Sequence, residues 1–118
     1  TAAIAAGGYN NQAITESWNG TSWTEVNDLN LGRYSLGGAG TQTLGLVFGG
    51  ANPAPNTAAT EEWNGVSWTE VNDLSTGRGE MGTAGTQTAA LAFGGNPPTT
   101  AATEEWSKAN VVTDLGVS

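Results

Sequence analysis

The sequence contains no cysteine and no histidine in its 118 residues. Without cysteine there are no disulfides and no thiolate chemistry, and without histidine there is no Ser-His-Asp catalysis and no imidazole-based zinc or haem site. Leucine, isoleucine, valine and phenylalanine are scarce, which rules out a helical bundle with a leucine-rich core. No run of about 18 apolar residues is present, so we expect no membrane insertion, and no signal-peptide pattern begins the sequence.

Basic residues are also few. Arg33, Arg78 and Lys108 stand against eleven acidic residues, for a net charge of −8 at pH 7 and an isoelectric point near 4.1. A protein that binds the phosphate backbone needs clustered lysine and arginine to release counterions. Three scattered cations do not provide such a cluster, so nucleic acid and anionic membrane surfaces are poor partners.

The sequence does contain a repeat. Residues 18–29 return as residues 63–74 with one difference in twelve, at a spacing of 45. The tetrapeptide at residues 40–43 returns at residues 85–88, also 45 residues later. Self-similarity at a fixed period of this length indicates a repeat architecture.

Within one period the pattern predicts four short β-strands and no helix. The predicted strands lie at residues 34–41, 43–48, 58–63 and 67–72. Asn64-Gly65 predicts a hairpin with a type I′ turn between the last two strands. In the last strand, alternation places Trp68 and Val71 on opposite faces. Four short strands in about 45 residues are typical of one blade of a β-propeller.

The order of these features resembles the kelch repeat. Gly32-Arg33 precedes an apolar strand that ends in Gly-Gly, and Trp68 and Leu74 follow the variable loop before the next Gly-Arg. Trp63 holds the usual tyrosine place of that repeat, and Trp68 its tryptophan place. The Ala/Thr/Gly/Asn-rich composition also resembles kelch-type repeats in uncharacterised bacteriophage and marine viral proteins. The resemblance implies an all-β fold of β-propeller blades with four antiparallel strands each.

The repeat frame divides the sequence into three parts. Residues 1–29 are a partial blade with strands 2–4, residues 30–74 a full blade, and residues 75–118 a full or slightly degenerate last blade with a closing strand at Val111–Leu115. The total is about 2.75 blades, whereas propellers need about 4–8. We therefore expect other chains or an upstream segment to close the ring, with a homo-oligomer of two or more chains as one solution.

The tryptophans have two interpretations. They recur at the repeat period, so packing between blades is favoured over a glycan-stacking platform. The set comprises Trp18, Trp23, Trp63, Trp68 and Trp106.

The charged residues are expected to be structural as well. The resemblance implies that Arg33 and Arg78 pair with acids or carbonyls of a neighbouring blade, with a ligand role in a central channel as the alternative. The expected acidic partners are Glu25, Asp28, Glu70 and Asp73. The pairs Glu61-Glu62 and Glu104-Glu105 raise the alternative of Ca²⁺ binding, but adjacent residues of a strand point to opposite faces. A solvated acidic rim is therefore favoured.

Glycine pairs end the second strand of each period. We expect a steric role from them, with positive φ and close approach of neighbouring backbone; the pairs of the two later periods are Gly49, Gly50, Gly94 and Gly95. The loops that follow, at residues 51–57 and 96–100, vary in length and are expected to be exposed. Their side chains for ligand contact are Asn52, Asn56, Asn96 and Thr99.

These features favour a non-enzymatic structural or adhesive module, on a virion or outside the cell, that needs no cofactor. The alternative is a carbohydrate-binding module that uses exposed tryptophan and loop residues. A third and weaker interpretation is a fragment of a hydrolase or oxidase with its catalytic residues elsewhere.

Overall fold

The computed structural model describes residues 2–51, 56–95 and 101–108. These residues form short β-strands and contain no helix, and hence none that could cross a membrane. The strands are β1 (Ala3–Ala6), β2 (Thr15–Trp18), β3 (Trp23–Val26), β4 (Gly37–Gly40), β5 (Gly45–Phe48), β6 (Thr60–Trp63), β7 (Trp68–Val71), β8 (Gly82–Gly85), β9 (Ala89–Phe93) and β10 (Thr103–Ser107). The predicted all-β fold is confirmed.

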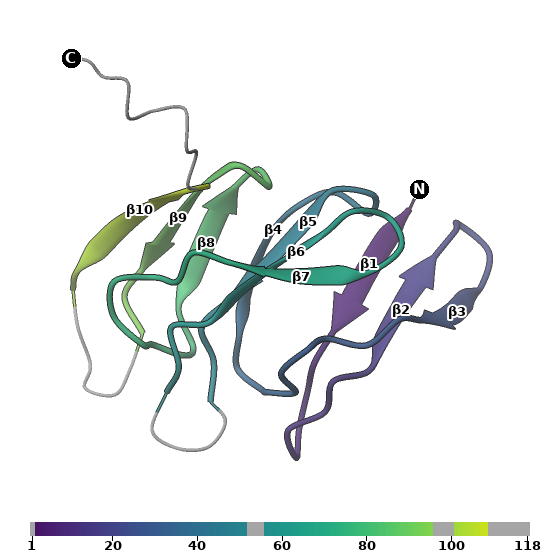
Figure 1. Ribbon diagram of the computed structural model, residues 1–118, viewed down its shortest axis with the longest axis horizontal. Coiled ribbons are helices and arrows are strands. Elements are labelled where there is room, and N and C mark those ends of the chain that lie inside the picture. The colour runs from purple at the N-terminus through teal and green to yellow at the C-terminus, as the bar shows by residue number, and fades with distance from the viewer. Residues whose placement is uncertain (1, 52–55, 96–100, 109–118) are drawn as a thin grey trace.

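The strands form three antiparallel sheets that lie side by side along the molecule (Figure 1). The N-terminal sheet has the order β1-β2-β3, the middle sheet β4-β5-β6-β7, and the C-terminal sheet β8-β9-β10. β4 and β8 are the edge strands with which the middle and C-terminal sheets begin, and we call them the inner strands. Within the described residues, only these two strands make extensive backbone contact across a boundary between sheets. The strand expected at Val111–Leu115 lies outside the described residues.

The same register recurs in each sheet. Ala3 pairs with Trp18, Gly45 with Trp63, and Ala90 with Trp106. β1, β5 and β9 are therefore equivalent strands, and β2, β6 and β10 are their equivalent partners. β5 and β9 each have an inner neighbour, β4 and β8 respectively.

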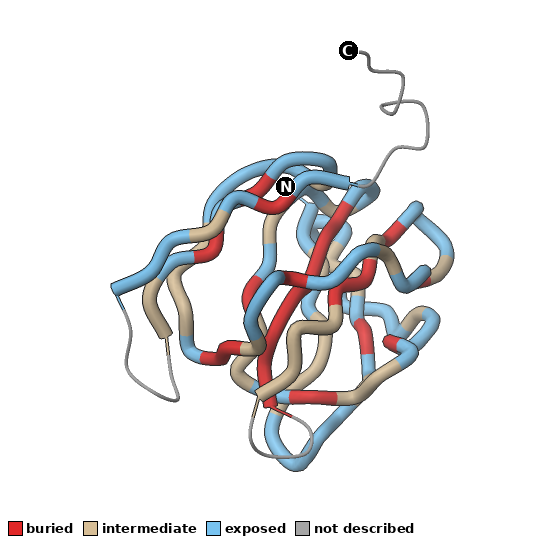
Figure 2. The backbone as a smooth tube through the Cα atoms, turned by 60° about the vertical axis from the view of Figure 1, so that its left-hand side comes forward, coloured by how far each residue is buried: buried red, intermediate tan, exposed pale blue. Residues whose placement is uncertain are grey.

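The middle sheet is covered on both faces, and all four residues of β5 are buried (Figure 2). Side chains alternate along a strand, so Leu46 and Phe48 pack with Ala90, Ala92 and Trp106 of the C-terminal sheet. The opposite face places Val47, Trp63 and Trp68 against Ile4 and Ala6 of β1. Trp68 and Val71 belong to these two different clusters, so their predicted placement on opposite faces is confirmed.

The hairpin between β6 and β7 differs from the predicted type I′ turn. Trp63 pairs with Trp68, so Gly65 and Val66 are the central residues and Asn64 lies before them. Only Gly65 has a positive φ, of +99°. The side chain of Asn64 accepts hydrogen bonds from the amides of Val66 and Ser67 at 2.8 and 2.9 Å. An Asx turn, which needs no left-handed asparagine, therefore replaces the predicted turn.

The Gly-Gly pairs end β5 and β9 in a left-handed backbone. The φ angles of Gly49 and Gly50 are +70° and +95°, and those of Gly94 and Gly95 are +72° and +98°. The amide of Gly50 donates to the carbonyl of Arg78 at 2.8 Å. A Cβ on Gly50 would lie only 2.7 Å from the carbonyl oxygen of Tyr34. These glycines thus let the loop between β5 and β6 pass close to the segments that precede β4 and β8.

Candidate functional site

A buried ion pair joins the loop between β3 and β4 to β6 of the middle sheet. Arg33 Nη1 donates to Glu61 Oε2 at 2.9 Å, and both side chains are fully buried. The other carboxylate oxygen, Oε1, accepts from the backbone amide of Asn30 at 2.8 Å, and Oε2 also accepts from the amide of Leu31 at 3.1 Å. The loop between β3 and β4 is thereby anchored on a single carboxylate of β6.

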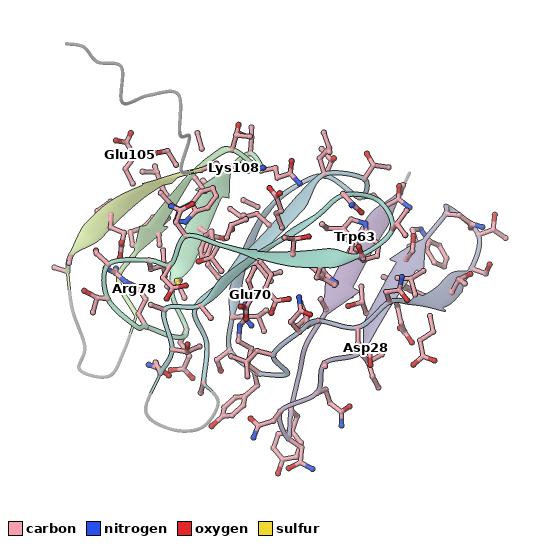
Figure 3. All side chains as sticks on the ribbon, in the orientation of Figure 1. Asp28, Trp63, Glu70, Arg78, Glu105 and Lys108 are labelled. Atoms are coloured by element: carbon pink, nitrogen blue, oxygen red, sulfur yellow. The ribbon has the colours of Figure 1, made fainter. Side chains whose placement is uncertain are left out.

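The same arrangement recurs between the middle and C-terminal sheets. Arg78, which is labelled in Figure 3, donates from Nη2 to Glu104 Oε2 at 3.0 Å. The amide and hydroxyl of Ser75 both donate to Glu104 Oε1 at 2.6 Å. Partial burial raises the pKa of Glu104, but the hydrogen bonds from Ser75 and the charge of Arg78 outweigh it, so this pKa lies below its ordinary value.

The acidic partners predicted for the two arginines are wrong. Arg33 and Arg78 pair with Glu61 and Glu104 instead; the predicted partners were Glu25, Asp28, Glu70 and Asp73. The reason is that the first glutamate of each Glu-Glu pair points towards the preceding sheet, where the arginine lies. The recurrence of Arg with a Glu-Glu-Trp motif 26–28 residues later is the sequence signal that could have found these pairs.

The predicted solvated acidic rim is wrong for the first glutamate of the middle sheet, because Glu61 is fully buried. Glu62, its neighbour, points to the other face and accepts from Lys108 at 2.9 Å. The described ranges hold no cluster of three or more acidic side chains that could surround a metal ion.

The tryptophans form equivalent pairs in two different surroundings. The ring centroids of Trp63 and Trp68 lie 5.1 Å apart, and those of Trp18 and Trp23 lie 5.3 Å apart. Trp63 and Trp68 are 3 % and 6 % exposed, whereas Trp23 is 50 % exposed. Trp23 is half-exposed because in the described structure no sheet covers that face of the N-terminal sheet, so its packing between blades stays a prediction.

The outer faces of the stack expose the residue types that are buried inside it. The N-terminal end face comprises Ala3, Ala5, Trp18 and Trp23, and the C-terminal end face comprises Leu91, Phe93 and Thr103. Leu91 and Phe93 are 40 % and 41 % exposed, although the equivalent Leu46 and Phe48 are buried. Each end face therefore has the composition of one half of an internal interface.

The variable loops are described only at their edges. Asn52, Asn96 and Thr99 lie outside the described residues, and Asn56 is half-buried beside Gly77 and Gly79. Ala51 is 6 % exposed and pairs with Tyr34. The expectation of an exposed loop is wrong at Ala51, because this residue continues the backbone pairing beyond the Gly-Gly turn.

The described site is thus a set of contacts between sheets and two apolar end faces. The buried carboxylate of Glu61 and the partly buried carboxylate of Glu104 each accept hydrogen bonds from an arginine and from backbone amides. The exposed side chains of the two end faces are mostly apolar or aromatic, so they suit packing against another surface or stacking on a ring. No family model and no curated protein matches the sequence.

Proposed function

We propose that the three sheets are kelch-like propeller blades and that the chain is a non-enzymatic structural module, which assembles head to tail with copies of itself to complete a ring. The carrying observation is the complementarity of the two end faces. Exposed contiguous apolar surface marks interaction sites in soluble proteins. Two copies bring six sheets, which lies within the propeller range of about 4–8.

The internal interfaces specify how two copies meet. Inside the chain, Val47, Trp63 and Trp68 of one sheet pack against Ile4 and Ala6 of the sheet before it. In the assembly, Trp18 and Trp23 of one copy take the places of Trp63 and Trp68. Leu91 and Phe93 of the next copy take the places of Ile4 and Ala6. Such a contact joins two different patches, so it is heterologous and forms a ring when its rotation closes.

One hydrogen bond identifies this packing. Inside the chain, the indole of Trp68 donates to Thr15 of the preceding sheet at 3.0 Å. Trp23 is equivalent to Trp68, and Thr103, which is exposed on the C-terminal end face, is equivalent to Thr15. The indole of Trp23 in one copy therefore donates to Thr103 of the neighbouring copy.

Native mass spectrometry of the wild-type chain and of two end-face variants tests the assembly. We expect an oligomer for the wild type at micromolar concentration, and monomers for Trp23→Asp and Phe93→Asp. Mixing these two variants restores one intact interface and yields a mixed dimer, which an isologous interface would not do. Tyr9→Ala, at an 88 % exposed residue outside both faces, is the control and should assemble normally.

A folded wild-type monomer of 11.9 kDa at every concentration would overturn the proposal.

The same proposal locates the module on a virion or outside the cell. This location is supported by the resemblance in composition to viral kelch-type repeats, and immunogold labelling of purified particles would test it.

The exposure of Trp23 favours carbohydrate binding as the second candidate. A half-exposed tryptophan beside Trp18 offers an aromatic surface for a sugar ring. In that case sugars should alter tryptophan fluorescence in the wild type but not in Trp23→Ala. Assembly and glycan binding would compete for this face, so a sugar that binds there should also dissociate the oligomer.

A further inference from the structure

The edge of β1 that faces away from β2 has no strand partner among the residues that the structure describes. The equivalent strands β5 and β9 each pair there with an inner strand, β4 or β8. Free backbone N–H and C=O groups along such an edge are a template for another extended chain. The N-terminal sheet therefore presents an accessible edge at the place where the middle and C-terminal sheets each have a further strand.

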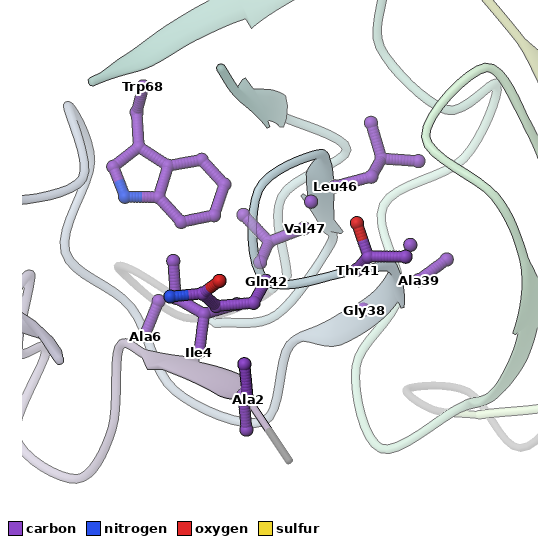
Figure 4. Close-up of a pocket in the computed structure, with 13 residues that line it drawn as sticks. Ala2, Ile4, Ala6, Gly38, Ala39, Thr41, Gln42, Leu46, Val47 and Trp68 are labelled. Atoms are coloured by element: carbon purple, nitrogen blue, oxygen red, sulfur yellow. The ribbon is translucent and has the colours of Figure 1, made fainter. Parts of the chain in front are cut away.

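A cavity of about 350 Å³ lies beside this edge, between the N-terminal and middle sheets (Figure 4). Ile4 and Ala6 of β1 form one wall, and Gly38, Val47 and Trp68 form the other. The walls are mostly apolar, and Gln42, at the rim, donates to Ser17 Oγ across the two sheets at 2.7 Å. The cavity is thus apolar inside, with backbone polar groups along one side.

The other boundary between sheets shows what occupies the equivalent space. There β8 lies against β4, and Thr83 Oγ1 donates to the carbonyl of Gly38 at 2.8 Å. A Cβ on Gly37 would lie 2.5 Å from the Thr83 methyl and 2.9 Å from the Phe48 ring. The inner strands that fill this space are therefore rich in glycine, because a larger residue at Gly37 would collide with the ring of Phe48.

One residue makes the space beside β1 wider than the equivalent spaces beside β5 and β9. Ala6 occupies the place of Phe48 and Phe93, the last residues of β5 and β9. A Cβ on Gly82 would collide with the ring of Phe93, whereas Ala6 has no ring. A strand paired with β1 can therefore carry a side chain at a position where the two internal strands need glycine.

We propose that the β1 edge and the adjoining cavity bind one extended, glycine-rich strand, antiparallel to β1, and that a strand supplied in trans fits there. Main-chain hydrogen bonds supply the affinity, and the small residues fit the space between the sheets. In the register of β4 and β8, the residue opposite Ala6 corresponds to Gly37 and Gly82. The site lies between two sheets and on neither end face, so the inference does not depend on head-to-tail assembly.

A peptide with the sequence of residues 80–87 and blocked termini is the probe. We expect it to shift and protect the amides of residues 3–6 in ¹H–¹⁵N spectra, and to change the fluorescence of Trp68, which lines the cavity. The titration is made on Phe93→Asp, so that self-association through the end faces does not contribute. Failure of self-association and failure of strand binding are then separate results.

Two matched changes test the register. A peptide with leucine in place of Gly82 should bind the wild-type groove about as well as the glycine peptide does. It should bind an Ala6→Phe protein at least about fivefold more weakly than the glycine peptide does, since overpacking costs about 1–3 kcal/mol. Ala6→Leu serves if Ala6→Phe does not fold. A peptide with proline at its two central positions should not bind, because proline lacks the backbone donor.

The proposal is overturned if millimolar peptide leaves the amides of residues 3–6 unchanged. It is also overturned if the proline peptide binds equally, since backbone pairing would then not be the basis of recognition. Equal affinity of both glycine and leucine peptides for Ala6→Phe would contradict the register.

Discussion

Trp68 and Thr15 lie 53 residues apart in sequence and are joined by a buried hydrogen bond, in which the indole Nε1–H donates to the threonine Oγ1 at 3.0 Å. Thr15 is fully buried and Trp68 is 6 % exposed. A buried tryptophan needs an acceptor for its single polar hydrogen. This bond therefore helps to set the position of the middle sheet on the N-terminal sheet.

Replacing Trp68 with alanine should lower the free energy of unfolding by about 3–5 kcal/mol, because a large buried side chain and its hydrogen bond are lost. Trp23→Ala is the matched control at the equivalent, half-exposed position, and should cost about 1 kcal/mol or less. Urea unfolding followed by far-UV circular dichroism at low protein concentration measures both. Equal costs would contradict the assignment of Trp68 to the core.

Replacing Arg33 with methionine should also be costly, at about 3–5 kcal/mol, because it leaves the buried Glu61 carboxylate without its charge partner. Arg78→Met should cost less, since Glu104 is 14 % exposed and water can solvate it. The double variant Arg33→Met/Glu61→Met should recover part of the loss. Chemical unfolding of the wild type, of Arg33→Met and Glu61→Met, and of the double variant tests the coupling, and purely additive losses would contradict it.

The depressed pKa of Glu104 predicts a specific pH dependence. Because the folded pKa lies below the ordinary value of 4.5, the ionised carboxylate contributes stability above that value and loses it as the pH falls through the folded pKa. Glu104→Gln should therefore be less stable than the wild type at pH 7, and the difference should shrink below about pH 4. Thermal unfolding at a series of pH values measures this, and a constant difference would show that the charge is not the cause.

Alanine at the two neighbouring glycines of β4 should give different results. A Cβ at Gly37 would collide with Thr83 and Phe48, whereas at Gly38 the nearest atom is the Leu46 carbonyl oxygen at 3.4 Å. Neither glycine has a positive φ, so backbone strain does not distinguish the two positions. We expect Gly37→Ala to cost about 1–3 kcal/mol and Gly38→Ala about 0.5 kcal/mol. Similar unfolding midpoints for the two variants would contradict close packing between β4 and β8.

The repeat was sufficient to predict the secondary structure. Residues that recur 45 positions apart, such as Trp18 and Trp63, occupy equivalent strands because local propensity and side-chain alternation depend only on nearby residues. The turn at Asn64-Gly65 shows the limit of this reasoning. The dipeptide signals a hairpin, but the register of Trp63 with Trp68 decides which residues are central.

The nearby sequence did not identify the acidic partner of Arg33, and it did not predict the exposure of Trp23. Glu25 and Asp28 are closer to Arg33 along the chain, yet Glu61 meets it, because the first glutamate of the pair faces the preceding sheet. Trp23 and Trp68 have nearly identical neighbours in sequence, but within the described residues only Trp68 packs against another sheet. The sequence by itself determined the strands, their glycine turns and the repeating apolar positions. The tertiary structure alone decided which of those positions are buried, since burial depends on which sheet lies next to each face.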